Sequence, residues 1–401
     1  MKHPFINTAF FLYTTIITLF PLLPVSLSKH ISFNISKSFF APHIKNEFSF
    51  GSSHNYFTIT TNTPFTLIVN DDFSNHEHKD AELIQSNTSI TIHNYPFNAD
   101  VYKRSITYQN KTLFDNFYYY VINITNTFII DKDNPIFSGF GFAYKFPNEN
   151  FSFIHQLYNN NHISKKQFTF MRHSKNEDGV IYFGDLPPEI KHTYNYRNNI
   201  KIKCDNNYDK WGNTLTSIKI NNKEYAFNQY AQFHLSEYSM IKSKKFMDII
   251  CNDVLNEYIG NNKECLLRYK YEGCKVLTCT KSVIDNIGNI SFIIDNKEIT
   301  LPFNKLFLSM SNQYQSEFGY NINNDNNNNN EQILNFGFPF AMLFSAVTFD
   351  YDNGDITLAL TNPEIKIKTL YNKHINQIYN VIIILCIIFI VYLIRVKKYF
   401  I

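Results

Sequence analysis

The chain of 401 residues is long enough for one large two-lobed domain or two ordinary domains. Hydrophobic residues make up 44% of it and charged residues 18%, a balance typical of a folded protein with a sizeable core. The net charge is only +3, and no block of basic residues alternates with aromatic residues, so the sequence does not indicate a nucleic-acid partner.

The first predicted element is a secretory signal peptide over residues 1–28. A basic start precedes a long apolar stretch that ends at Ser26-Leu27-Ser28, a small-x-small cleavage pattern. The alternative is an uncleaved N-terminal anchor, and two prolines inside the stretch argue against it. We therefore expect the mature chain to enter the secretory pathway.

An N-terminal segment at 29–54 has no clear period, and a β-rich half follows from 55 to 196. Aromatic and β-branched residues alternate there over short runs, which is the pattern of strands separated by turns. The predicted strands lie at 56–61, 65–69, 89–95, 104–109 and 117–130. A short helix is expected within 151–164, and a hairpin within 168–187 that turns at 176–179.

A second β-rich half is predicted from 197 to 361, with an Asn-rich insert at 321–330. Its one clear helix begins after Ser243, a good N-cap, and stops at Gly260. We expect one buried helix face formed by Phe246, Ile250, Val254 and Tyr258. Hairpins are expected with turns at Asp295-Asn296 and, as a type I′ turn, at Asn353-Gly354. The fold class is therefore all-β with a few short helices, in two halves of similar size.

The C-terminal part predicts a membrane anchor. Residues 362–377 form a juxtamembrane linker, 378–396 a transmembrane helix, and 397–401 a cytoplasmic tail. Basic residues just after the apolar run indicate that the short tail faces the cytosol, and they argue against a removed GPI-anchor signal. A single-pass type I protein is expected, with its bulk outside the cytosol.

Five cysteines precede the predicted span, and four of them cluster in one short stretch. These four are Cys251, Cys265, Cys274 and Cys279. Two disulfides are plausible in an oxidising compartment, in any of three pairings, and Cys204 is left over as a buried or reactive thiol. A zinc site is the rival interpretation, but the spacings fit no standard ligand pattern. The six Asn-x-Ser/Thr sequons would be usable glycosylation sites in this topology.

Several stretches together resemble the pepsin-like (A1) aspartic protease family, the plasmepsins included. They occur in the family's order: FSGFGFAY (137–144), the stretch 153–187, Trp211 before a strand, GNISFIIDNKEITLPF (288–303) and the closing block 333–360. The resemblance covers roughly residues 55–361 and implies a bilobal pepsin-like fold. The Asn-rich insert is similar to low-complexity insertions in apicomplexan parasite proteins.

This family uses two Asp carboxylates, one from each lobe, that share a proton and activate a water molecule. Each stands in Asp-Thr-Gly, and no Asp-Thr/Ser-Gly occurs in this chain. In the first lobe FTLIVNDDFSN (65–75) is similar to the family's motif, which implies that Asn70 stands at the catalytic Asp and that Asp71 and Asp72 fill the turn. An amide cannot shuttle a proton, so this half is expected to be disabled.

In the second lobe AQFHLSEYSMIKSKKF (231–246) is similar to the family's second motif. The resemblance places His234 at the second catalytic Asp and Glu237 two positions beyond Leu235. ITYQNKT (106–112) is the candidate flap, the hairpin that closes over a substrate, and its Tyr108 is the candidate binding residue. The shortened TNTPF hairpin (61–65) before the first motif departs from the family's pattern.

Three arrangements of these residues remain open. In the first, a register shift brings Asp71 or Asp72 to the catalytic position, paired with Glu237 or His234, and restores catalysis. In the second, Asn70 and His234 meet in the cleft as a hydrogen-bonded pair without catalysis. In the third, both are ordinary loop residues.

The sequence therefore predicts a membrane-anchored pseudoprotease, on the cell surface or in a secretory organelle, that binds a protein or peptide partner. No metal, cofactor or nucleic acid is expected. The alternatives are an active, divergent aspartic endopeptidase of the secretory pathway and a structural component of a secretory organelle. A microgamete surface protein of malaria parasites is one identity that fits, although no motif isolates it.

Overall fold

The structure is a computed structural model of the whole chain. It describes residues 29–37, 42–44, 48–50, 53–54, 57–61, 63–69, 81–92, 95–108, 111–122, 139–146, 148–172, 179–193, 199–235, 240–260, 263–271, 274–310, 313–316, 318–321, 333–360, 363–370, 385 and 387.

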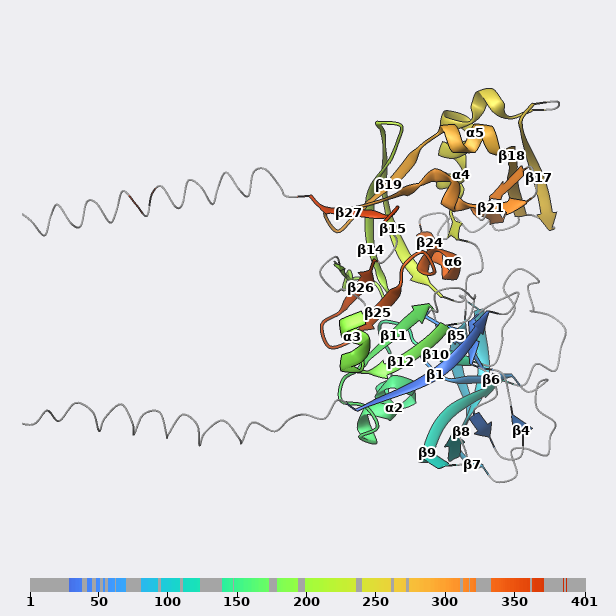
Figure 1. Ribbon diagram of the computed structural model, residues 1–401. Helices are drawn as coiled ribbons and strands as arrows, with labels where there is room; N and C mark the ends of the chain where they lie inside the picture. Colours follow the sequence, from blue (N-terminus) through green and yellow to red (C-terminus); the bar gives the residue numbers. More distant parts are fainter. Residues whose placement is uncertain are drawn as a thin grey trace, which may run out of the picture.

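Two large β-sheets form the framework of the described chain (Figure 1). The first has fifteen strands, in the order β13 (Ile200–Lys203), β26 (Asp355–Ala359), β25 (Ala346–Asp350), β11 (Gln167–Arg172), β12 (Gly179–Gly184), β1 (His30–Lys37), β2 (Pro42–Ile44), β5 (Phe57–Thr60), β10 (Gly139–Gly141), β6 (Leu67–Val69), β9 (Lys111–Ile122), β8 (Tyr95–Tyr108), β3 (Phe48–Phe50) and β4 (Ser53–His54), with β7 (Glu82–Ile92) beside β8.

The second sheet has twelve strands and belongs to the C-terminal half. Its order is β21 (Phe307–Met310), β22 (Gln313–Ser316), β18 (Cys274–Thr280), β23 (Phe318–Asn321), β16 (Ile241–Lys242), β24 (Ile333–Gly337), β15 (Lys223–His234), β14 (Gly212–Ile220), β19 (Asn289–Ile294), β20 (Lys297–Pro302) and β27 (Lys366–Thr369), with β17 (Cys265–Tyr271) beside β18. The expectation of a mostly β, two-lobed fold is confirmed.

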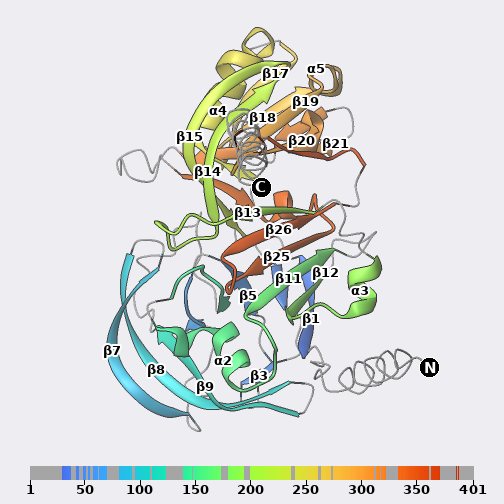
Figure 2. The ribbon, with the colours of Figure 1, turned by 90° about the vertical axis from the view of Figure 1, so that its left-hand side faces the viewer.

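The two halves share the first sheet. Six of its strands, in the order β13-β26-β25-β11-β12-β1, cross the middle of the molecule (Figure 2). The hairpin β25–β26 comes from the end of the C-terminal half, yet β25 pairs with β11 of the N-terminal half, from Gln167↔Asp350 to Met171↔Ala346. β1 extends the same six-stranded region, so the segment 29–54, which had no clear period, contributes four strands to the framework.

Local sequence signals predicted two-residue turns for two of the hairpins, one of them correctly. The predicted turn at Asp295-Asn296 joins β19 to β20, and both residues have positive φ, as a two-residue primed turn requires. The predicted type I′ turn at Asn353-Gly354 is wrong. β25 and β26 pair from Asp350↔Asp355 outward, which leaves a four-residue loop, and only Gly354 has positive φ there. The Asp350 carboxylate accepts hydrogen bonds from the backbone and side chain of Asn353, which closes the longer loop.

The helices are short. They are α2 (Phe153–Asn159), α3 (Pro188–Thr193), α4 (Lys244–Asp248), α5 (Lys281–Asn286) and α6 (Phe338–Ala341), the 3₁₀ turns η3 (Glu149–Phe151), η6 (Asn256–Tyr258) and η7 (Phe303–Leu306), and the π-helix η5 (Ile249–Val254). Ser243 caps α4 through its hydroxyl, as expected, and Phe246 and Ile250 are buried. Tyr258 is exposed instead, because the chain changes from α to π winding after Asp248 and this rotates the later residues off the face.

Two further predictions fall on the ends of the chain. Among the described residues, no helix is long and apolar enough to cross a membrane. The predicted span 378–396 lies outside the described residues except for Leu385 and Ile387, and the predicted signal peptide 1–28 lies outside them entirely. Both therefore stay predictions.

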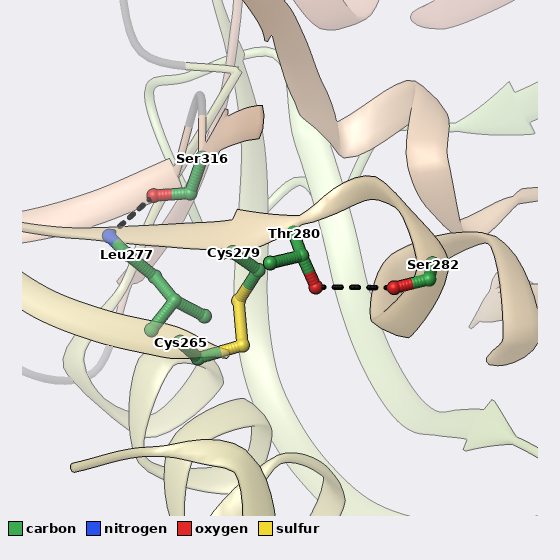
Figure 3. The surroundings of a disulfide bond; sticks show 6 residues. All are labelled: Cys265, Leu277, Cys279, Thr280, Ser282 and Ser316. Carbon is green, nitrogen blue, oxygen red and sulfur yellow. Dashed lines mark hydrogen bonds between the residues drawn. A yellow bond between two sulfur atoms is a disulfide. The ribbon is translucent and has the colours of Figure 1, made fainter. Parts of the chain in front are cut away.

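One disulfide links β17 and β18 (Figure 3). It joins Cys265 and Cys279, which face each other in the strand register. This bond rules out two of the three predicted pairings and leaves Cys251–Cys274 as the partner bridge. The Cys274 side chain lies outside what the structure describes, so that second bridge stays a prediction.

We expect Cys204 to be inert toward thiol reagents in the folded protein. The residue is 3% exposed, and burial raises the pKa of its thiol to about 12, so almost no nucleophilic thiolate forms at pH 8. Alkylation followed by peptide mass mapping should find Cys204 unmodified in the native chain and modified after unfolding in urea. Rapid labelling of the native protein at Cys204 would contradict this burial.

Candidate functional site

His234 ends a long strand in the middle of the second sheet. β15 pairs in parallel with β24, and this register places His234 opposite Gly337. The chain then turns back, and β16 pairs with the other edge of β24 in the antiparallel direction. β24 thus lies between the strand that leads into the turn and the strand that leaves it. His234 is 7% exposed, at the point where the turn begins.

The N-terminal half repeats this arrangement. β10 lies between β5, which is parallel to it, and β6, which is antiparallel to it. The register places Thr60 opposite Gly141, as His234 stands opposite Gly337. Each glycine stands in Phe-Gly-Phe. A Cβ at Gly141 would lie 2.4 Å from the backbone oxygens of Thr63 and Phe65, so only glycine fits this crossing.

The side chain of Thr61 joins the two turns. Its hydroxyl donates a hydrogen bond to the backbone oxygen of Phe233 (2.8 Å) and accepts one from the backbone N–H of Leu235 (2.9 Å). These two groups flank His234, and Thr61 directly follows Thr60. Thr61 is 2% exposed, so both bonds are buried. These two hydrogen bonds hold the end of β5 next to the end of β15. Thr60 and His234 also occupy equivalent positions in the two sheet registers, so both observations pair Thr60 with His234.

The resemblance to the family implied that Asn70, rather than Thr60, is the first-half counterpart of His234. Asn70, Asp71, Asp72 and Glu237 lie outside the described residues, so their own side-chain positions stay predictions. The backbone before them is described, however. FTLIV ends in β6, which is the outgoing strand of the N-terminal turn and corresponds to β16 rather than to β15. By register, the first-half counterpart of His234 is Thr60.

The candidate flap is a hairpin, as expected. β8 and β9 pair as antiparallel neighbours as far as Tyr108↔Lys111. The Tyr108 hydroxyl donates to the backbone oxygen of Ser32 (3.0 Å), and its ring contacts Phe33 edge-on at 4.7 Å. Both partners belong to β1. The residue predicted to contact a ligand is therefore anchored to the N-terminal strand.

The described neighbours of His234 include a pair of neutral amides. On β15 and β24 the Gln232 side chain donates to the Asn335 side chain, and Gln232 is 4% exposed. Within the part of the chain that the structure describes, no three His, Cys, Asp or Glu side chains gather as metal ligands would.

The fold is that of a two-lobed aspartic protease. In each half one strand lies between the two strands that flank a turn, and the Thr61 hydroxyl links the two turns by hydrogen bonds. Residues 86–361, well over half of the chain, match the family model described as eukaryotic aspartyl protease. The chain belongs to this family. The match begins after both Thr60 and Asn70.

Among solved structures the chain is similar to the aspartic proteinase from Irpex lacteus. The TM-score is 0.62 at 13% sequence identity, and the similarity covers 83% of this chain and 98% of that one. At this identity the likeness shows the fold alone. A comparison with curated proteins gave no match.

Proposed function

We propose that this protein is a catalytically inactive aspartic protease that binds a protein or peptide partner. The observation that supports the proposal is the pair of positions at the two bridged strand ends, Thr60 and His234. Neither residue type is a carboxylic acid. The family's reaction needs one carboxylate as base and one carboxylic acid as proton donor. Threonine has no usable pKa for either role, and a single histidine replaces only one of them.

The fold is kept although the dyad residues differ. The buried Thr61 bridge and the shared six-stranded sheet hold the two halves in a fixed arrangement, and the close packing at Gly141 fixes the strands within the first half. A two-lobed scaffold with this arrangement and no catalytic pair is suited to binding. We further propose that it is a type I membrane protein of the cell surface or a secretory organelle, with the plasmepsins as its relatives within the family. The support is the sequence of its two ends and its Asn-rich insert, which would also fit a microgamete surface protein of malaria parasites.

An active, divergent endopeptidase is the second candidate function. Family membership favours it, and so do Asp71 and Asp72, two carboxylates that follow Asn70 shortly after β6. It requires these residues to meet Glu237 or His234. A structural role in a secretory organelle is the third candidate, and it predicts neither cleavage nor a soluble ligand.

We expect the purified protein to cleave no peptide between pH 3 and 6 and to bind no pepstatin-like inhibitor. The assay should use a peptide library with an active pepsin-type enzyme as the positive control. Asp71→Asn, Asp72→Asn and Glu237→Gln variants should behave as the unchanged protein does. Cleavage that any of these three variants abolishes, while Asp352→Asn retains it, would establish the endopeptidase instead. Cross-linking on intact cells would then separate a ligand-binding protein from an organelle scaffold.

A further inference from the structure

A buried histidine lies where the N-terminal half contacts the hairpin donated by the C-terminal half. His155 is on α2 and is 4% exposed. Its ring contacts Phe146 at 4.9 Å and Tyr351 at 5.8 Å, both edge-on. Tyr351 is the first residue after β25, in the loop of the hairpin β25–β26. The ring of His155 therefore contacts both Phe146 of its own half and Tyr351 of the C-terminal half.

The two ring nitrogens of His155 have different surroundings. Nε2 lies 3.3 Å from a carboxylate oxygen of Glu149, which is mostly exposed. Nδ1 is buried and finds no hydrogen-bond partner among the described residues. In the neutral ring the proton on Nε2 faces Glu149, and Nδ1 is a buried acceptor without a partner, which costs less than a buried charge. A second proton would add a buried N–H donor at Nδ1, an atom for which the described residues show no hydrogen bond, and a positive charge inside the junction.

Polar contacts between Lys166 and the loop of the hairpin β25–β26 also stabilise this junction. The backbone N–H of Tyr351 donates to the oxygen of Lys166 (3.0 Å), and the Lys166 N–H donates to the Asp352 carboxylate (3.2 Å). The Lys166 ammonium lies 3.5 Å from the other oxygen of that carboxylate. The charged groups that face His155 are thus Glu149 from η3, Lys166 from the segment before β11, and Asp352 from the hairpin loop. α2 itself carries no charged side chain.

These surroundings decide which protonation state the fold favours. Burial lowers the pKa of His155 from its ordinary 6.5; Glu149 and Asp352 raise it and Lys166 lowers it further, and the net direction is downward. The folded state thus takes up the proton less readily than the unfolded state. Above pH 6.5 the ring is neutral in both states and the junction carries no penalty. As the pH falls below 6.5, the unfolded or opened state gains protons first, so stability is lost down to the folded pKa.

We propose that His155 is an acid-sensitive latch between the two halves, which holds α2 against the hairpin β25–β26 while neutral and releases that contact when it is protonated. The released contact would free the hairpin loop from the N-terminal half and loosen the shared sheet at its centre. The proposal depends on neither catalysis nor ligand binding, so it stands or fails apart from the proposed function.

The chain contains its own reporter for this junction. Trp211 is its single tryptophan, and the indole lies 4.7 Å from the Tyr351 ring. Emission of the full-length protein should change between pH 7.5 and 5.5. Over the same range the unfolding equilibrium constant in urea should rise by up to about tenfold per pH unit below 6.5.

The test compares His155→Phe, which keeps an aromatic ring without a titrating group, with His162→Gln as the matched control. His162 is a half-buried histidine of the same half, and its ring packs against Phe114 of β9. The fluorescence change should vanish and the pH dependence of unfolding should become clearly smaller in His155→Phe, whereas both should persist in His162→Gln. The same pH response in His155→Phe as in the unchanged protein would overturn the proposal.

A second measurement removes the dependence on a variant that folds. Hydrogen exchange of the Tyr351 amide, corrected for the intrinsic effect of pH, should speed up at least several-fold in the unchanged protein between pH 7.5 and 5.5. The amide of Phe292, in β19 of the second sheet, serves as the internal reference and should show no such acceleration. Equal corrected rates for Tyr351 at the two pH values would refute the latch.

Discussion

Replacing Trp211 by alanine is expected to lower the free energy of unfolding by about 3–5 kcal/mol, the usual cost of removing a large buried aromatic residue. Trp211 is fully buried and packs against Tyr144 from the N-terminal half and Phe349 and Tyr351 from the closing hairpin. Its indole N–H donates to the backbone oxygen of Phe142 at 2.6 Å. The substitution would empty a space that residues of both halves line and leave that oxygen without its donor.

The measurement is urea denaturation followed by far-ultraviolet circular dichroism, because the substitution removes the only tryptophan. Trp211→Phe should lose less than the alanine variant, since it keeps most of the ring and forfeits chiefly the hydrogen bond, worth about 1–3 kcal/mol when a buried partner is left unsatisfied. Tyr258→Ala, at an exposed aromatic residue, is the control and should change stability by less than about 0.5 kcal/mol. A loss below about 1 kcal/mol for Trp211→Ala would show that the aromatic contacts do not hold the halves together.

The elements that could be predicted from the sequence are those that local patterns determine. Alternation of apolar residues located several strands, among them β5, β6 and β9, and the Asp295-Asn296 turn fixed one hairpin because two adjacent residues accept positive φ. Ser243 marked a helix start because its hydroxyl caps that helix directly. The family resemblance also gave the two-lobed fold, since its motifs are spread over the chain in order.

The first-half counterpart of His234 could not be predicted in the same way, because sheet register depends on strands that are far apart in sequence. FTLIVNDDFSN resembles the family's motif more closely than YFTITTNTP does. The order of strands is set by β10, about 80 residues further on, which inserts between β5 and β6. The sequence does contain one usable signal, because Phe-Gly-Phe occurs both at Phe140-Gly141-Phe142 and at Phe336-Gly337-Phe338. These glycines end β10 and β24, and the residues paired with them are Thr60 and His234.

Other differences also have nonlocal causes. Asp350 reaches Asn353 and lengthens the hairpin loop that Asn353-Gly354 alone would have made tight. The disulfide pairing follows from the register of β17 and β18, which no spacing of cysteines determines. Tyr108 bonds to Ser32 because β1 lies against the end of β8, and the segment that contains β1 showed no period.

Replacing Thr61 by valine tests the register directly, and we expect it to cost about 2–6 kcal/mol of stability. Valine has nearly the shape of threonine, so the packing is kept, but the hydroxyl is lost. The backbone oxygen of Phe233 and the N–H of Leu235 are then both left buried without a partner, at about 1–3 kcal/mol each.

Thr61→Ser is the matched control, because it keeps the hydroxyl and removes one methyl group, which is worth about 0.8 kcal/mol. The two variants should therefore differ by more than about 1 kcal/mol in urea denaturation followed by Trp211 emission. If Asn70 rather than Thr60 were the counterpart of His234, Thr61 would belong to an ordinary hairpin and the hydroxyl would have no partner across the halves. Valine, with its higher strand propensity, would then be tolerated as well as serine. A large difference in unfolding free energy between the two variants supports Thr60 as the first-half counterpart of His234 and, with it, the absence of a catalytic pair. Equal stabilities would favour Asn70 as that counterpart, and Asp71 and Asp72 would again be candidates for catalysis.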